Sequence, residues 1–384
     1  MSRVVVLLLT AMAGMTLLAA ACSVPTEPPP PEREEPIFAQ GEYGGQPLPG
    51  TENLYNLMPS PSGDRIALIR ERTPGKPFDP RNQLWIVDRD GSNPQLISVN
   101  TITVNWHPSG DQVAVTVFRN FTVHTIDLET LETTQWTGEE NQRISFEVAS
   151  SSGWFPDGHR ILVHVNQRAY QQPFPRGLYV IDTRDSTTTG PLVELMQATT
   201  FGNQKKYVVG KKYLRDRGPI SGNFARYTFA DSTWHWITDF PKDSLDLVDT
   251  PVPSPTADLA VQPRYVGYAE QLFLFRTDPD GTDEDARQIT TLGGDNPRWG
   301  PDGSYFIFRR DVNRGQGARY VPYRFDLETM QARPLWPALP DSVPKFPDLS
   351  TQTLNQMAPR RGSPSPRAPS PSRKIAREGY VFES

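Results

Sequence analysis

The sequence contains few of the residues and motifs on which most catalytic and metal sites depend. Cys22 is its only cysteine, which excludes an intramolecular disulfide, a CxxC redox pair and a multi-cysteine zinc site. Its five histidines form no HExxH motif, and there is no GxSxG nucleophile motif. Apolar residues make up only 36% of the chain, which argues against a protein that crosses a membrane several times.

Proline, by contrast, is abundant. The chain has 39 prolines in 384 residues, roughly twice the average usage. Because proline in a helix interior removes a hydrogen bond and clashes with the preceding turn, this content argues against a mainly helical protein.

The N-terminus has the pattern of an export signal. Arg3 is followed by the apolar stretch 4–21, which ends in three alanines directly before Cys22. The segment 1–21 resembles a bacterial lipoprotein signal peptide, after which Cys22 would receive lipid, although Ala19 stands where leucine is usual. Plain secretion and an uncleaved membrane anchor are the alternatives. The resemblance implies an exported protein, anchored in a membrane of the bacterial cell envelope and facing the periplasm or the outer surface.

Proline-rich segments flank the centre of the chain. Residues 22–51 are rich in proline and glutamate and are expected to form an extended tether. Residues 341–384 are rich in proline, serine and arginine and are expected to be disordered, with a net charge of +4 over residues 359–384. The end of this tail, Tyr380 to Phe382, is an alternative docking peptide that would add a strand to a partner sheet.

A repeat of about 48 residues organises the segment 52–340. Its marker is a proline-containing turn, which recurs at Pro61, Pro108, Pro156, Pro255 and Pro301, at intervals of 47, 48, 99 and 46 residues. The interval of 99 spans two periods, so a degenerate copy is expected near residue 202. An apolar strand follows each turn, a second strand then leads to an aspartate, and a short third strand comes next in most copies. With the strand that precedes the turn, this gives four strands per repeat and six repeats.

Four-stranded antiparallel units of this length are typical of β-propeller blades. The fold class is therefore all-β, a six-bladed propeller. The turns Trp106 to Gly110, Trp154 to Gly158 and Trp299 to Gly303 resemble the W-[SGHF]-P-D-G turns of WD40-like propellers of the TolB type. The resemblance covers about 290 of the 384 residues. It is to the propeller and not to TolB as a whole, because TolB carries an α/β domain before its propeller and here the tether stands in that place.

The two faces of such a propeller differ in charge. With the strands of a blade labelled a to d from the centre outward, the a–b and c–d turns share one face, here called the a–b face, and the b–c and d–a loops share the other, the b–c face. The a–b face is acidic. On the b–c face the six b–c segments carry +10 and three d–a segments carry −6, which leaves about +4.

The basic segments lead to a hypothesis for the partner. The b–c face is expected to bind an envelope protein or an anionic ligand through basic side chains with aromatic anchors between them. The residues are Arg168, Tyr170, Phe174, Arg176, Lys211, Lys212, Tyr213, Arg215 and Arg217. The alternative is a solvated rim that only keeps the blade edges soluble.

Catalysis is not favoured by the sequence. His107, His159 and His164 lie in or beside the repeat and are expected to fill positions in it. The acidic segment 278–286 departs from the EF-hand template at Thr282, so an ordinary hairpin is expected in place of a calcium site. We expect no cofactor, no metal, no nucleic acid partner and a monomer. The predicted function is a non-catalytic protein–protein interaction module. The alternative is a propeller enzyme, or a protein that binds carbohydrate or another ligand, with its site in the central channel.

Overall fold

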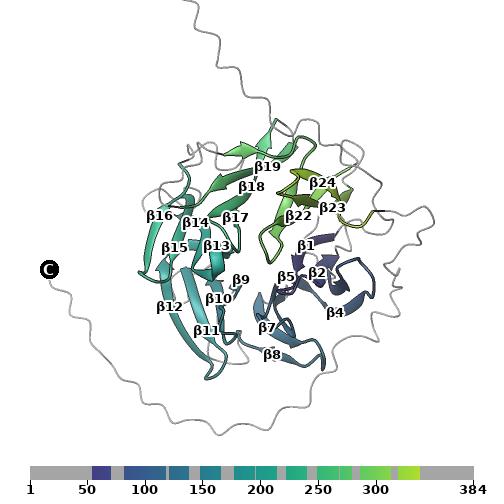
Figure 1. Ribbon diagram of the computed structural model, residues 1–384. Helices are drawn as coiled ribbons and strands as arrows, with labels where there is room; N and C mark the ends of the chain where they lie inside the picture. Colours follow the sequence, from purple (N-terminus) through teal and green to yellow (C-terminus); the bar gives the residue numbers. More distant parts are fainter. Residues whose placement is uncertain are drawn as a thin grey trace, which may run out of the picture.

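A computed structural model shows six small antiparallel sheets arranged in a ring (Figure 1). The residues it describes are 54–70, 82–117, 121–137, 148–165, 177–194, 196–213, 222–239, 249–267, 269–278, 286–312 and 319–337. The predicted signal peptide, the tether that begins at Cys22 and the tail from residue 341 onward lie outside these ranges.

The described residues form 24 strands in six sheets of four, and each sheet is one blade built from consecutive strands. Blades 1 and 2 contain β1 (Leu54–Pro59), β2 (Arg65–Arg70), β3 (Gln83–Asp88), β4 (Gln95–Val99), β5 (Thr101–Trp106), β6 (Gln112–Val117), β7 (Thr122–Asp127) and β8 (Thr133–Gln135). Blades 3 and 4 contain β9 (Val148–Trp154), β10 (Arg160–Val165), β11 (Gly177–Asp182), β12 (Thr187–Glu194), β13 (Met196–Gly202), β14 (Tyr207–Tyr213), β15 (Gly222–Thr228) and β16 (Thr233–Trp236), with a 3₁₀ turn at Asn203–Lys205. Blades 5 and 6 contain β17 (Val252–Pro253), β18 (Leu259–Val266), β19 (Ala269–Arg276), β20 (Arg287–Gln288), β21 (Asp295–Trp299), β22 (Tyr305–Asp311), β23 (Tyr320–Asp326) and β24 (Gln331–Pro334). The prediction of an all-β, six-bladed propeller is confirmed.

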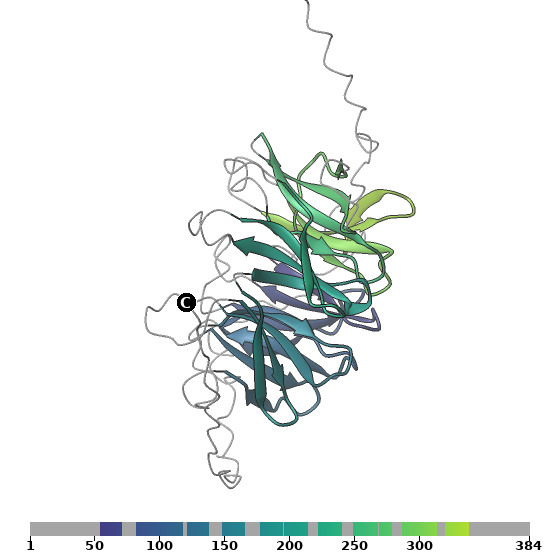
Figure 2. The ribbon, with the colours of Figure 1, turned by 90° about the vertical axis from the view of Figure 1, so that its left-hand side faces the viewer.

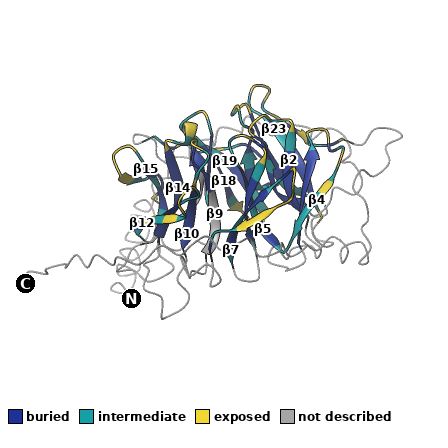
Figure 3. Ribbon diagram, turned by 90° about the horizontal axis from the view of Figure 1, so that it is seen from below, coloured by how far each residue is buried: buried dark blue, intermediate teal, exposed yellow. Residues whose placement is uncertain are grey.

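The hydrophobic core lies between the blades. Each of its six clusters contains residues of two neighbouring blades, so every blade buries both faces of its sheet. The second strand of the blades is the most continuously apolar, as in β2, where four successive residues from Ile66 to Ile69 are buried. A strand covered on both faces has no solvent side and loses the alternation of a half-buried strand. Exposed residues gather in the turns and the outermost strands (Figure 3).

The a–b turns repeat one hydrogen-bonding pattern. The amide of the residue before the turn proline donates to the carbonyl four residues after that proline, as from Ser60 to Arg65 and from His107 to Gln112. In blades 1, 2, 3 and 6 a glycine with positive φ lies two residues after the proline, for example Gly63 at 75° and Gly303 at 70°. Glycine adopts this left-handed conformation without a steric penalty, which explains why the turn is so regular in the sequence.

Blade 4 carries the degenerate copy that the repeat interval predicts. Its turn lies at Asn203–Lys205 between β13 and β14, and Lys205 takes the left-handed conformation with φ of 60°. A lysine therefore stands where four other blades have glycine.

Two details of the sequence interpretation are wrong. The segment 262–270 is not a b–c loop, because β18 and β19 pair along their whole length from Leu259↔Arg276 to Val266↔Ala269 and leave only a tight turn at Gly267. The polar residues of β18 make hydrogen bonds in the fold: Gln262 donates to the Asp249 carbonyl at 2.8 Å and accepts from Arg264 Nε at 2.9 Å. In blade 4, β15 ends at Thr228, three residues before the predicted end at Asp231, which lies in the following turn.

The ring closes by side-chain packing and hydrogen bonds between blades 6 and 1, and Figure 2 shows the blades from the side. Trp336, just after β24, packs among Leu54, Trp85 and Tyr305 and donates from Nε1 to the Arg89 carbonyl at 3.0 Å. Arg298 Nε donates to Asn56 Oδ1 at 3.0 Å on the same boundary. Among the described residues, these two blades share no strand, since each consists of four consecutive strands.

Candidate functional site

Most of the side chains predicted to bind a partner, basic and aromatic, fall outside the described residues. Arg168, Tyr170, Phe174, Arg176, Arg215 and Arg217 belong to this group. Lys211, Lys212 and Tyr213 form the end of β14, so they are strand residues and not part of a long loop.

Lys212 is engaged within the fold. Its Nζ donates to the Glu194 carbonyl at 3.1 Å and lies 4.6 Å from the ring centroid of Trp234. Burial lowers the pKa of its amino group. These contacts tie the central part of blade 4 to its outer strand and to the end of blade 3, which gives Lys212 a structural role as well as a charge.

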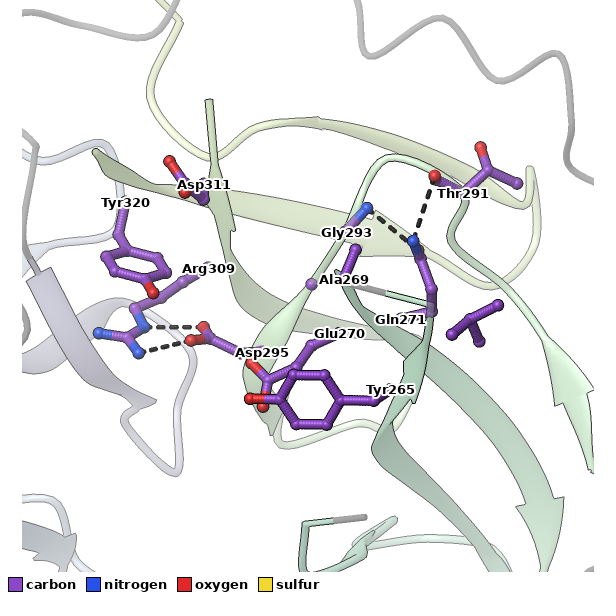
Figure 4. Close-up of a pocket in the computed structure, with 12 residues that line it drawn as sticks. Tyr265, Ala269, Glu270, Gln271, Thr291, Gly293, Asp295, Arg309, Asp311 and Tyr320 are labelled. Atoms are coloured by element: carbon purple, nitrogen blue, oxygen red, sulfur yellow. Dashed lines mark hydrogen bonds and ion pairs between the residues drawn. The ribbon is translucent and has the colours of Figure 1, made fainter. Parts of the chain in front are cut away.

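The b–c face carries a cavity of about 660 Å³ between blades 5 and 6 (Figure 4). Its walls come from the ends of β18 and β22 and the starts of β19, β21 and β23. Tyr265 and Tyr320 lie on opposite sides, with Glu270, Asp295 and Arg309 between them (Figure 4). The exposed apolar side chain of Val266 also belongs to its lining.

A bidentate ion pair fixes one wall of this cavity. Arg309 donates to the two carboxylate oxygens of Asp295 at 2.8 and 2.6 Å, and both side chains are largely buried. The guanidinium lies 4.4 Å from the ring centroid of Tyr320, in cation–π geometry. The paired charges and the stacked ring hold this wall in one arrangement.

Glu270 is the chemically distinctive group of the cavity. Burial raises its pKa to about 7, the negative charge of Asp295 adds to the increase, and a hydrogen bond from Tyr265 opposes it. A carboxyl group that titrates near neutral pH can donate or accept a proton and can hydrogen-bond a polar ligand in either form. Sequence reasoning missed this site, because its residues come from two blades and the charges of the segment 262–270 cancel.

A second cavity, of about 440 Å³, is the mouth of the central channel on the a–b face. All six blades contribute to it through the ends of their first strands and their a–b turns. Its described lining includes Trp106, Trp154 and Trp299 and no carboxylate or histidine. Seven of the remaining members are prolines, namely Pro59, Pro61, Pro108, Pro156, Pro253, Pro255 and Pro301.

The indole groups of the mouth connect neighbouring blades. Trp106 Nε1 donates to the Met58 carbonyl and Trp299 Nε1 to the Val252 carbonyl, each at 2.8 Å. Trp154 is also buried, but its Nε1 has no hydrogen-bond partner among the described residues. A buried donor without a partner is costly and can be satisfied by a ligand or by water.

Two of the described histidines, His107 and His164, have positions that suit structural roles. His107 donates from Nε2 to the Gly158 carbonyl at 2.8 Å and packs edge-on against Trp154 with ring centroids 4.7 Å apart. His164 is buried in β10. Within the described residues, no three histidine, cysteine or acidic side chains lie close enough to hold a metal ion. Residues 279–285 of the acidic segment lie outside the described part.

Solved structures share this architecture. TolB from Acinetobacter baumannii superposes with a TM-score of 0.53 at 17% identity, covering 72% of this chain and 64% of TolB. The chain folds as a TolB-like propeller. The tricorn protease superposes on this chain with a TM-score of 0.52 at 16% identity, covering 78% of this chain and 27% of the protease. A putative TolB from Agrobacterium tumefaciens gives a TM-score of 0.48 at 13% identity, covering 64% of this chain and 84% of the other.

These similarities establish the fold and not the activity. The TolB-like propeller spans less than two thirds of the Acinetobacter protein and about a quarter of the protease. No protein-family model matches the sequence, and no curated protein sequence matches it. One of the two better-matching structures is a protease, so the fold alone does not decide between binding and catalysis. No helix among the described residues is long and apolar enough to cross a membrane.

Proposed function

We propose that this protein is a lipoprotein of the bacterial cell envelope whose propeller is a non-catalytic protein-binding module. The signal-like segment before Cys22 supports export and lipid attachment. The TolB-like fold supports a rigid disc whose loops and channel mouth are free to meet a partner.

The lining of the channel mouth is the observation that carries the proposal. Its tryptophans and prolines form a rigid, mainly apolar recess, and such recesses are typical of protein-binding surfaces. An enzyme site would need converging acid, base or nucleophilic groups. The charged members of the described lining are Lys205 and Arg298, and Arg298 is held by Asn56.

A pair of substitutions on the same face tests this proposal. Pro61→Glu places a carboxylate at the exposed edge of the mouth, whereas Leu131→Glu places one on an exposed c–d turn. After formaldehyde cross-linking in intact envelopes, we expect Pro61→Glu to reduce recovery of the cross-linked partner at least about fivefold, and Leu131→Glu to leave it unchanged. Equal recovery from wild type and Pro61→Glu, with both proteins folded by circular dichroism, contradicts the role of the mouth.

The basic side chains of the b–c face remain a second proposed contact for an acidic partner. Because Lys212 also supports the blade, its substitution alone mixes binding with stability. Reversing Lys211, Arg215 and Arg217 to glutamate leaves the Lys212 contacts in place. We expect these changes to slow association and to reduce its dependence on salt. An association rate equal to that of wild type at low salt would remove this surface from the proposal.

The cavity between blades 5 and 6 favours a different candidate function, the binding of a polar ligand such as a carbohydrate. Two tyrosine rings and a carboxyl group with a pKa of about 7 suit hydroxyl-rich ligands. A glycan array probed with wild type and with Tyr265→Ala tests it. Signals lost in the variant support carbohydrate binding, and identical signals from both proteins exclude Tyr265 from any such site.

A further inference from the structure

Lys205 occupies a strained position in the ring of a–b turns. Its φ is 60°, and the preceding Gln204 has φ of 54°. The equivalent positions of blades 1, 2, 3 and 6 are Gly63, Gly110, Gly158 and Gly303. A lysine in this left-handed conformation carries a steric cost that glycine avoids, and residues held in such conformations concentrate at binding and catalytic sites.

The Lys205 ammonium has no paired anion within the described part of the chain. The neighbouring carboxylates are already engaged: Asp157 accepts from Arg160 Nε at 2.5 Å and Asp182 from Arg184 at 2.7 Å. The Lys205 Nζ atom lies 5.9 Å from the centroid of the Phe201 ring. Burial lowers the pKa of this amino group to about 8, and the negative charge of Asp157 opposes the shift only in part.

Lys205 stands where two cavities meet. It belongs to the lining of the channel mouth and also to that of a groove of about 560 Å³ between blades 3 and 4. The groove has an aromatic wall, in which Phe155 and Phe229 pack edge to face with centroids 5.1 Å apart and Tyr227 packs against Phe229 at 5.5 Å. Leu192 and Val180 extend the apolar surface.

The rest of the groove is mainly polar and includes Arg160, whose guanidinium lies 4.5 Å from the Phe155 ring centroid, and Asp182. These observations describe a cation beside an aromatic wall in a groove of mixed polarity. A partly buried cation is stabilised by an anionic partner, and the carboxylate of Asp157, whose charge acts on Lys205, is already paired with Arg160. The volume is in the range of small-ligand sites, which combine an apolar wall with a few placed polar groups.

We propose that Lys205 binds the carboxylate of a ligand whose apolar or aromatic body lies in the groove between blades 3 and 4. The carboxylate is that of a small organic acid or of the C-terminus of a polypeptide, since both present the same group. The site goes beyond the proposed function, because the groove has its own walls and its ligand need not be the partner at the channel mouth.

Competitive acetylation of the full-length protein, read by mass spectrometry, tests the site directly. Lys206 is the internal control, since it is adjacent in sequence and exposed. We expect 3-phenylpropionate at up to about 50 mM to slow acetylation of Lys205 about tenfold and to leave Lys206 unaffected. The neutral 3-phenylpropionamide should protect neither lysine. Equal protection by acid and amide overturns the proposal.

A peptide arm distinguishes the two sources of the carboxylate. N-acetyl-alanyl-phenylalanine is compared with its C-terminal amide in the same assay. Protection by the peptide acid, in addition to or in place of the small acid, assigns the site to a polypeptide C-terminus. Protection by the small acid alone assigns it to a small molecule, and failure of both acids contradicts the site.

The variant Lys205→Gly separates binding from folding. It restores the glycine of four other blades, so it is expected to fold, whereas Lys206→Gly serves as the matched control. By calorimetry we expect the protective acid to lose at least about tenfold in affinity for Lys205→Gly and to keep its affinity for Lys206→Gly. Unchanged affinity in a folded Lys205→Gly protein rules out Lys205 as the carboxylate ligand.

Discussion

At the residue scale, Glu270 has the most unusual environment of the described carboxylates. Its pKa of about 7 lies well above the ordinary value of 4.5, because it is buried beside Asp295. Between pH 4.5 and 7 the folded protein therefore holds a proton that the unfolded chain releases. Stability consequently falls as the pH rises through this window and then levels off above pH 7.

Replacing Glu270 with glutamine should abolish this dependence. A neutral amide keeps an acceptor for Tyr265 and removes the buried charge. We expect Glu270→Gln to raise the free energy of unfolding at pH 8 by about 1 to 2 kcal/mol, allowing for solvent screening, and to change little at pH 4. Urea unfolding at pH 4 and pH 8 measures this change in the free energy of unfolding. The control is Glu132→Gln, which replaces an exposed glutamate. If Glu270→Gln changes the free energy of unfolding equally at the two pH values, the Glu270 carboxyl group is not buried with a raised pKa.

At the element scale, blades 4 and 6 share a variation of the repeat. In each, a glycine precedes the a–b turn and a tyrosine begins the second strand: Gly202 with Tyr207, and Gly300 with Tyr305. A Cβ on Gly300 would lie 2.3 Å from the Tyr305 ring. An arginine from the third strand lies over the ring, with Arg324 Cζ 3.9 Å from the Tyr305 centroid.

This packing predicts a compensating pair of substitutions in blade 6. Gly300→Ser alone should lower the free energy of unfolding by about 2 kcal/mol, because the added atoms overlap the tyrosine ring. Blade 5 has Ser254 and Leu259 at the equivalent positions, so adding Tyr305→Leu should restore part of the loss. Chemical denaturation of the two single variants and the double variant measures the coupling. Simple additivity of the two losses would show that the glycine and the tyrosine do not depend on each other.

The elements also show how much the sequence determines. Most a–b turns and the strands after them were predictable, because proline and glycine mark the turns of blades 1, 2, 3 and 6, and an apolar run follows them. The turn of blade 4 was predictable only from the repeat interval. The hairpin of β18 and β19 was not, because Gln262, Arg264 and Glu270 read as a polar loop, while in the fold Gln262 and Arg264 bond within the strand and to the Asp249 carbonyl. The cavity between blades 5 and 6 was also not predictable, since no local sequence pattern brings Glu270 next to Asp295.

At the scale of the whole molecule, the ring depends on contacts between blades 6 and 1 that share no strand. Trp336 is central to this closure through its packing and its bond to the Arg89 carbonyl. A Cβ on Gly91 would lie 3.1 Å from the Trp336 ring, so the indole fits closely against the c–d turn of blade 1.

Trp336→Ala should therefore destabilise the propeller by about 3 to 5 kcal/mol, through lost apolar burial and a cavity at the closure. Trp234→Ala is the matched control, because that side chain is 42% exposed on an outer strand. Its expected cost is below about 1 kcal/mol. Thermal and urea unfolding measure both variants. Similar losses in the two would mean that the boundary between blades 6 and 1 is not especially dependent on Trp336.

The central claim is that this TolB-like propeller binds a protein partner at its channel mouth. Its most direct test is site-specific photo-cross-linking in intact envelopes, with a photoreactive residue at Gln204 in the mouth, at Leu131 on a c–d turn of the same face, or at Val266 on the b–c face. We predict that one partner of defined mass is captured from position 204 and from neither of the other two positions. Capture of that partner from position 266 or 131 but not from 204 would contradict the claim.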